Sequence, residues 1–162
     1  MLQIKIKEKI FVRNENGLDP HLDSLFDLAL LESHMDQQKS LQTIEEIKEK
    51  YEKEEKNDLN EATFEKRLGE LMLRLKDRTE ESILHFNNSL KSYEKLIESL
   101  NDDSSLQKVQ IYENVVVVLN HLAQLMFEKE NHTEMGKKKK NLHSFLNLFF
   151  KFVFCPIRGV FE

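Results

Sequence analysis

Residues 115–135 read VVVVLNHLAQLMFEKENHTEM, and the structure assigned to this stretch decides the fold. Four consecutive valines favour a strand, because β-branched side chains prefer an extended chain. The apolar residues around them nevertheless recur every three or four positions, which is the period of a helix. They are Val109, Tyr112, Val116, Leu119, Ala123 and Met126. We therefore predict a helix, and a second apolar stripe of Val115, Leu122 and Leu125 predicts that this helix is central in the fold.

The composition of the whole chain also favours helices. The chain has 162 residues, a length typical of one domain, with 40% hydrophobic and 33% charged residues, as in soluble folded proteins. It contains only 4 glycines and 2 prolines, too few for the many turns of an all-β domain. We predict an all-α protein of four to five antiparallel helices, with its helical domain over residues 19–143.

The first residues differ from this pattern. Apolar and polar residues alternate between Leu2 and Ile6, which is the period of a strand, but no second strand follows. We therefore predict an extended N-terminal arm over residues 1–18. Asp19 and Pro20 then fit the N-cap and first position of a helix.

Two segments of helical period precede the middle of the chain. Apolar residues at helical spacing continue from Pro20 to Tyr51, but residues 36–40 carry none, so we expect a break there. Residues 45–58 mix both signs of charge, which indicates a solvent-exposed helix with i,i+4 ion pairs. The sequence NDLN at 57–60 predicts the next break.

The central region carries the clearest periodicity. One apolar face is formed by Phe64, Leu68, Leu71, Met72 and Leu75. We predict Thr79 as the N-cap of the following helix, with Glu80 and Glu81 in the first turn, where acids suit the helix dipole. That helix has a heptad pattern made of Ile83, Phe86, Leu90, Tyr93, Ile97 and Leu100.

Residues 64–135 resemble tetratricopeptide repeats, including the longer repeats of kinesin light chains. Such a repeat has a Leu-Gly or Leu-Ala pair in its first helix and a small residue near the start of its second. The matching residues are Leu68-Gly69, Met72, Ser82, Phe86 and Ser89, followed by Leu119, Leu122-Ala123 and Met126. The small residues among them, Gly69, Ser82, Ser89 and Ala123, let two helices approach closely. The resemblance implies a stack of helical hairpins, while an antiparallel bundle or a coiled coil satisfies the same periodicity.

The resemblance implies a scaffold that binds other proteins along the surface of its first helices. Arg67, Arg74, Asn120 and Gln124 are the outward-facing candidates for that contact. As an alternative, the heptad over residues 83–100 could join two copies of the chain in a coiled coil.

A Phe-rich C-terminal tail over residues 144–162 gives a third possibility. Its apolar run is shorter than the ~20 residues that a membrane-spanning helix needs, but a basic cluster beside it could hold an anionic membrane surface. A peripheral membrane adaptor would use Lys137, Lys138, Lys139, Lys140, Phe149 and Phe150. The tail could equally pack into the core as a last helix, or lie outside the folded repeat.

The sequence carries no motif for catalysis, a cofactor or a metal. Its six histidines never occur as His-x-x-x-His or Glu-x-x-His, and its glycines are isolated. The single Cys155 cannot form an intramolecular disulfide, which points to a reducing compartment. The net charge of −5 argues against nucleic-acid binding. We expect a cytoplasmic protein without enzymatic activity or cofactor.

Overall fold

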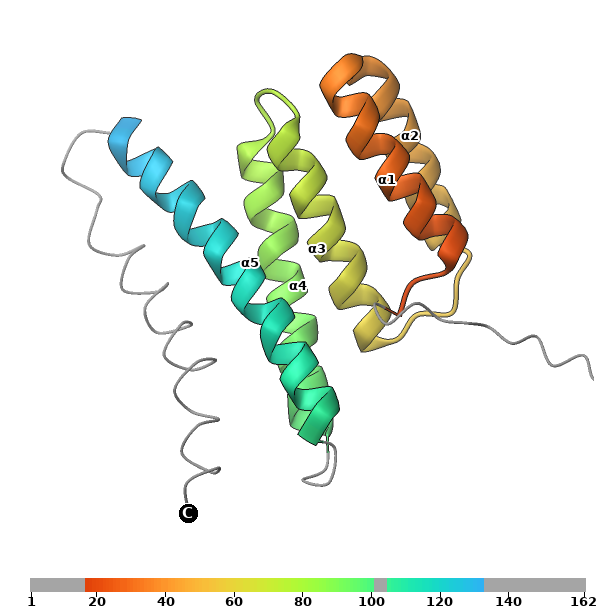
Figure 1. Cartoon of the computed structure of the whole chain (residues 1–162), viewed down its shortest axis with the longest axis vertical. Helices are drawn as coiled ribbons and strands as arrows, with labels where there is room; N and C mark the ends of the chain where they lie inside the picture. Colours follow the sequence, from red (N-terminus) through yellow and green to blue (C-terminus); the bar gives the residue numbers. More distant parts are fainter. Residues whose placement is uncertain (1–16, 101–104, 133–162) are drawn as a thin grey trace, which may run out of the picture.

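The computed structural model describes residues 17–100 and 105–132, and these residues form helices and no strand. The helices are α1 (Pro20–Met35), α2 (Gln37–Tyr51), α3 (Asp58–Arg74), α4 (Thr79–Ser99) and α5 (Ser105–His132) (Figure 1). The predicted all-α class is confirmed, and the four valines at 115–118 lie in a helix as expected.

Two aspartates set the ends of the first two helices. The carboxylate of Asp19 accepts hydrogen bonds from the backbone N–H groups of His21 and Leu22, at 2.8 and 3.4 Å, so α1 begins at Pro20 as predicted. Asp36 has an extended backbone that ends α1, and its carboxylate accepts from the N–H groups of Gln38 and Lys39. The break predicted at residues 36–40 therefore occupies one residue, and α1 and α2 form a hairpin.

The turn between α3 and α4 differs by one residue from the prediction. Thr79 is the first residue of α4 and not its N-cap; Arg78 occupies the cap position without a side-chain cap hydrogen bond. Asp77 adopts a left-handed conformation with φ of 61°, which completes the reversal of the chain before Thr79. Glu80 and Glu81 do lie in the first turn of α4.

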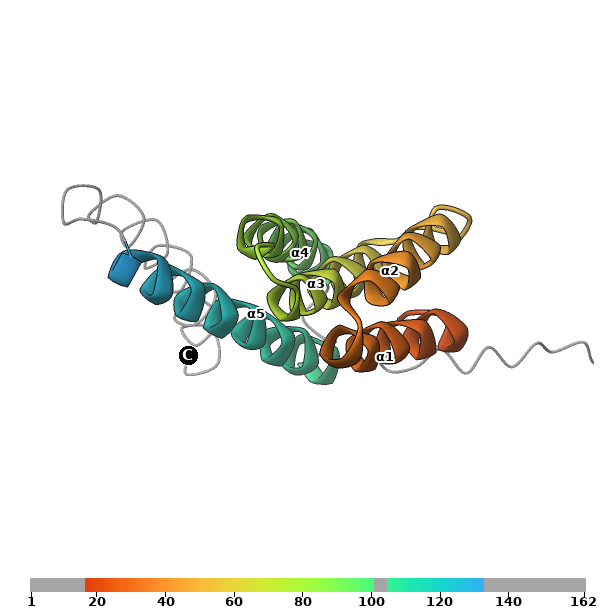
Figure 2. The same ribbon diagram turned by 90° about the horizontal axis from the view of Figure 1, so that it is seen from above.

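α3 is the central helix of the described structure. It contacts α1 on one side and α4 on the other, and α5 packs against α4 (Figure 1). Seen from above, α1 and α5 lie along one side of the molecule and α2 and α4 along the other, with α3 between them (Figure 2). The prediction that the helix containing the four valines is central is therefore wrong.

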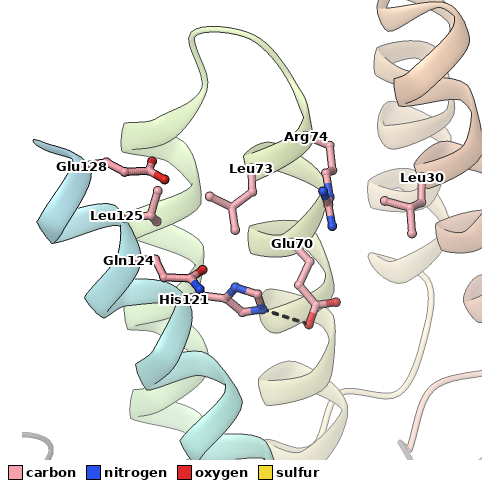
Figure 3. A pocket seen from close by; sticks show the side chains of 8 residues that line it. All are labelled: Leu30, Glu70, Leu73, Arg74, His121, Gln124, Leu125 and Glu128. Carbon is pink, nitrogen blue, oxygen red and sulfur yellow. Dashed lines mark ion pairs between the residues drawn. The ribbon is translucent and has the colours of Figure 1, made fainter.

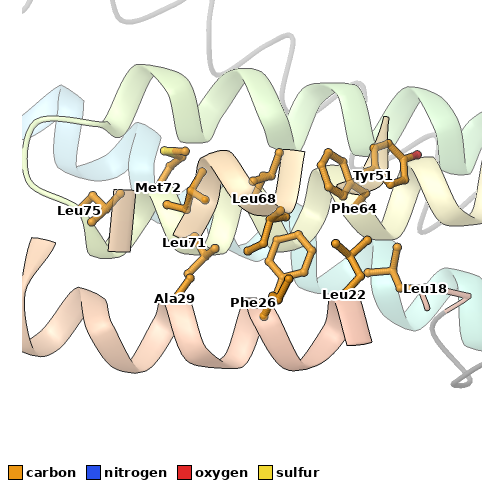
Figure 4. Packing of buried hydrophobic residues seen from close by; sticks show 13 residues of the cluster. Leu18, Leu22, Phe26, Ala29, Tyr51, Phe64, Leu68, Leu71, Met72 and Leu75 are labelled. Atoms are coloured by element: carbon orange, nitrogen blue, oxygen red, sulfur yellow. The ribbon is translucent and has the colours of Figure 1, made fainter. Parts of the chain in front are cut away.

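One hydrophobic core joins the first hairpin to α3. It consists of Leu18, Leu22, Leu25, Phe26, Ala29, Ile44, Ile47, Tyr51, Phe64, Leu68, Leu71, Met72 and Leu75 (Figure 4). The ring of Phe64 stacks on Tyr51 with centroids 3.6 Å apart and meets Phe26 edge to face at 5.7 Å. Aromatic contacts therefore tie α3 to both helices of the first hairpin.

Two residues assigned to the N-terminal arm belong to this core. Leu18 is fully buried in the cluster, and Gly17 is buried against α3. Gly17 has φ of +79°, and a Cβ atom there would lie 2.9 Å from Oδ1 of Asn60, so both conformation and space require glycine. The folded region therefore begins before residue 19, and residues 1–16 lie outside the described part.

A second core joins the other face of α3 to α4 and α5. Its buried members are Ala62, Phe86, Leu90, Tyr93, Ile111, Val115, Val118, Leu119, Leu122 and Leu125. In α5 the buried face is centred on the second stripe, and Leu119 is the member of the expected stripe that is fully buried with it. Val109 and Val116 of the expected stripe are 53% and 40% exposed, so the predicted register is wrong. Periodicity identifies two apolar stripes on α5, but only the neighbouring helix decides which one is buried.

Serine hydroxyls hold each hairpin together. Ser40 of α2 donates to the carbonyl of Ala29 in α1 at 2.8 Å, and Ser82 of α4 donates to that of Gly69 in α3 at the same distance. Ser89 adds a third such bond to the carbonyl of Ala62. These hydroxyls are buried and hydrogen-bonded, so the bonds offset the cost of desolvating small polar residues between closely packed helices.

Candidate functional site

A hollow of about 420 Å³ lies between α1, α3 and α5, and we call it the groove (Figure 3). Its lining residues come from α1, α3 and α5, which are not consecutive in the sequence because α2 and α4 lie between them. They are Leu30, Glu70, Leu73, Arg74, His121, Gln124, Leu125 and Glu128. The stacking of the two hairpins and α5 therefore creates the groove, since no single hairpin contains it.

Leucines form the apolar part of the groove. Leu73 of α3 and Leu125 of α5 point toward each other across it, and Leu30 of α1 stands on the opposite side (Figure 3). Leu125 is 3% exposed, and Leu73 packs against the second core. The apolar floor is thus continuous with the interior and is held rigidly.

His121 connects the groove to the core beneath it. One face of its ring stacks on Phe86, with centroids 5.2 Å apart and planes at 7°. Its Nε2 lies 4.0 Å from Oε1 of Glu70 on α3, with both side chains about 30% exposed. The core therefore fixes the orientation of the imidazole, while one ring edge remains available to the groove.

A second polar contact joins α3 and α5 beyond this pair. The Nζ of Lys66 donates to Oδ1 of Asn114 at 2.7 Å. Burial lowers the pKa of the Lys66 ammonium, and the nearby Glu70 carboxylate opposes that effect. These two contacts hold α3 and α5 at a fixed separation along the groove.

Arg74, Gln124 and Glu128 form the exposed rim of the groove. No described residue forms an ion pair with Arg74 within 4 Å. The rim therefore offers a guanidinium donor, an amide and a carboxylate beside an apolar floor. This combination suits contact with a polypeptide segment, which carries both apolar and hydrogen-bonding groups.

The structure places the four predicted contact residues in three different surroundings. Arg74 and Gln124 both line the groove, one from α3 and one from α5. Asn120 is exposed on α5 but does not line the hollow. Arg67 does not face outward, and that part of the prediction is wrong.

Arg67 instead ties α3 to α1. Its Nη2 lies 3.1 Å from the carboxylate of Asp23 and 2.7 Å from that of Asp27. Its guanidinium also lies over the Phe26 ring, 5.4 Å from the centroid, and the side chain is only 22% exposed. Contacts within the chain therefore account for this arginine.

The groove also includes residues that sequence reasoning missed, namely Leu30, Glu70, Leu73, His121 and Glu128. Glu70 lies one helical turn before Arg74, and His121 and Glu128 each lie one turn from Gln124. These three residues could have been predicted, because residues three or four positions from Arg74 and Gln124 share their helix face. Leu30 could not be found this way, because only the packing of α1 on α3 brings it there.

The six residues predicted for membrane contact lie outside the described residues: Lys137, Lys138, Lys139, Lys140, Phe149 and Phe150. Within residues 17–100 and 105–132, no helix combines the length and apolar character needed to cross a membrane. In the same part of the chain, no three His, Cys, Asp or Glu side chains gather closely enough to hold a metal ion.

The heptad of α4 is largely used within the chain. Phe86, Leu90 and Tyr93 are at most 3% exposed, and they pack in the second core with α3 and α5. These three side chains therefore present no surface to a second copy.

No protein-family model, no curated protein and no solved structure matches this chain.

Proposed function

We propose that this chain is a non-catalytic scaffold, which holds a segment of another protein in the groove between α1, α3 and α5. The observation that carries this proposal is the lining of the groove. Three leucines form an apolar floor, and the groups of Glu70, Arg74, His121, Gln124 and Glu128 surround it. An apolar centre with a polar rim is the usual composition of a protein-binding surface.

The charges around the groove suggest what such a segment contains. Glu70 and Glu128 supply two carboxylates, and Arg74 supplies one guanidinium at the α3 side. We propose an apolar anchor residue that contacts Leu73 and Leu125, with a basic neighbour on the α5 side. A volume of about 420 Å³ suits a few side chains rather than a folded domain.

The similar hairpins support a tetratricopeptide-like stack as the basis of this function. Ala29 and Gly69 accept the two serine hydrogen bonds and lie 40 positions apart, while Ser40 and Ser82 lie 42 positions apart. A period of this length agrees with the longer repeats that the sequence resembles. In such a stack the first helices of successive hairpins line one face, as α1, α3 and α5 line the groove. We propose that this scaffold works in the cytoplasm without a cofactor.

Site-specific photo-crosslinking tests the proposal. A photoreactive amino acid replaces Gln124 in the groove, and in a matched protein it replaces Lys95, an exposed residue of α4. We expect one set of proteins to crosslink at position 124 and not at position 95. The same set should disappear when Arg74→Glu reverses the rim charge, while the far-ultraviolet circular dichroism stays unchanged. Equal crosslinking at both positions, or no effect of Arg74→Glu, would contradict the groove as the binding site.

A further inference from the structure

A line of apolar side chains on α5 is exposed, and we call it the α5 stripe: Val109, Val116, Ala123 and Phe127. Successive residues turn by about 100° in a helix, so these four lie on one face, away from the buried face of α5. Val109, Val116 and Phe127 are 53%, 40% and 70% exposed, and Ala123 is partly exposed. The exposed polar residues Glu113 and Asn120 lie on the same face between them. Several large apolar side chains exposed on one helix face nevertheless favour an interface there.

The same line of positions exists on α3, where it is covered. Ala62, Gly69 and Leu73 have the spacing of Val116, Ala123 and Phe127. Ala62 and Gly69 face α4, while Leu73 packs against the second core at the edge of the groove. Ser89 and Ser82 of α4 donate to the carbonyls of Ala62 and Gly69. Phe86 lies so close to Gly69 that a Cβ there would be 2.7 Å from its ring.

Each of these α3 positions lies 54 residues before its α5 counterpart, and the buried faces of α3 and α5 correspond at the same distance along the sequence. Phe64, Leu68 and Leu71 of α3 are buried against the first hairpin. Their counterparts Val118, Leu122 and Leu125 of α5 are buried in the core shared with α4. α5 therefore packs on the second hairpin as α3 packs on the first. What α5 lacks among the described residues is a helix in the position that α4 takes on α3.

We propose that residues 142–154 of the same chain cover the α5 stripe, as α4 covers α3. Six of the 11 phenylalanines in the chain follow residue 132, five of them between 145 and 154. Leu142, Phe145, Phe149 and Phe152 recur at helical spacing, so they form one apolar face if this segment is helical.

The length of the connection favours this occupant over a second copy or another protein. Nine residues, 133–141, separate α5 from the segment. Fully extended, they reach about 30 Å, which is ample for a reversal. A covalently attached segment also has a far higher effective concentration than any free partner. The proposal does not depend on the function of the groove.

Spin labelling of the full chain tests the proposal without any mutation, because Cys155 is the sole cysteine. A nitroxide on Cys155 broadens the nuclear magnetic resonance signals of nearby methyl groups. We expect loss of the Val109 and Val116 methyl signals and their return when the nitroxide is reduced. The Ile44 and Ile47 methyl signals should persist, because both residues pack in the first core and α2 lies on the other side of α3 from α5 (Figure 2). Equal broadening of all four residues would overturn the proposal.

Two further samples distinguish the proposed segment from a second copy of the chain and from a membrane. An isotope-labelled chain without nitroxide is mixed with an unlabelled chain that carries it, and in this mixture the Val109 and Val116 signals should remain. Their loss in the mixture would assign the stripe to a second copy. If the free chain shows no nitroxide-dependent loss, and anionic phosphatidylserine vesicles then broaden the signals of all four residues with or without the nitroxide, the tail is assigned to a membrane. Either result would overturn the proposal.

A matched pair of substitutions tests the location of the contact. Val116 lies in the stripe and Val117 beside it, and both are 40% exposed. Val116→Lys should release the segment and restore the Val109 methyl signal, whereas Val117→Lys should leave that signal broadened. Ala123→Lys serves as a second stripe variant if Val116→Lys does not fold. Equal effects of the stripe variant and Val117→Lys would contradict the proposed face.

Discussion

The hairpins α1–α2 and α3–α4 share one interhelical contact but differ in the side chains around it. In each, a serine donates to the carbonyl of a small residue at 2.8 Å. Four positions after the serine, the first hairpin has Ile44 and the second has Phe86, both fully buried. The small residue is Ala29 in the first hairpin, whereas in the second it is Gly69.

This difference shows how the size of one core residue limits the residue opposite. The Phe86 ring occupies the space that a Cβ atom at position 69 would need. The first hairpin accommodates the methyl group of Ala29, and it adds a buried polar contact in which Thr43 donates to the Glu32 carboxylate at 2.6 Å. Similar hairpins can therefore be built with either an aromatic–glycine pair or an aliphatic–alanine pair.

Truncation of the aromatic residue should have the largest effect. We expect Phe86→Ala to lower the free energy of unfolding by about 3–5 kcal/mol, because it leaves a cavity beside Gly69 and removes the surface on which His121 stacks. Ile44→Val, a smaller truncation in the first hairpin, should cost about 0.5–1.5 kcal/mol. Urea unfolding followed by circular dichroism measures both. A cost for Phe86→Ala below that of Ile44→Val would refute the close packing described for the second hairpin.

Replacement of Gly69 by the alanine that the first hairpin has should produce the next largest effect. Gly69→Ala should destabilise the protein by about 1–3 kcal/mol, because the new methyl group meets the buried Phe86 ring. The gain in helix propensity, about 1 kcal/mol, is too small to reverse the sign. Combined with Phe86→Leu, Gly69→Ala should cost less than the sum of the two single changes. Additive costs in the same urea experiment would show that the two residues do not compete for space.

The two arginines of α3 give a smaller contrast. Arg67→Ala removes the contacts with Asp23, Asp27 and the Phe26 ring, so we expect a loss of about 1–2 kcal/mol. Arg74→Ala, at the exposed rim of the groove, should change stability by less than about 0.5 kcal/mol. Thermal unfolding of both variants checks this. Equal melting temperatures for the two would argue against the role of Arg67 in joining α3 to α1.

Tyr93→Phe should have the smallest effect at neutral pH. Burial raises the pKa of the Tyr93 hydroxyl to about 12, above its ordinary value of 10.0. The unfolded chain therefore loses the Tyr93 proton at a lower pH than the folded chain does. The contribution of this group to the free energy of unfolding is fully present below pH 10 and is lost as the pH rises toward 12. Two pKa units correspond to about 2.7 kcal/mol. Urea unfolding between pH 8 and about 11.5 should show a shallower decline for Tyr93→Phe than for the unchanged chain.

The helix ends could largely be predicted from the sequence, because local chemistry determines them. Asp19 and Asp36 both act on the backbone within three residues, and no distant contact is needed. The all-α class follows in the same way from apolar spacing. Thr79 shows the limit of this approach, since Arg78 occupies the cap position although its side chain forms no cap hydrogen bond.

The register of α5 and the groove could not be predicted with the same success. α5 has two apolar stripes, and the sequence alone does not state which one meets α4. Arg74 and Gln124 were predicted to face outward and do line the groove, but Arg67 has similar chemistry and turns toward α1. Such choices depend on which helix lies opposite, and that information is spread over distant parts of the chain.

The position of α3 has a consequence for how this part of the chain unfolds. One face of α3 completes the first core and the other face contributes to the second, so neither core can open without exposing α3. The two hairpins are therefore thermodynamically coupled, and melting of the described helices should be cooperative rather than stepwise. Amide protons in the middle of α3 should exchange with solvent most slowly, only through global unfolding, while those at the ends of α1 and α2 exchange through local opening.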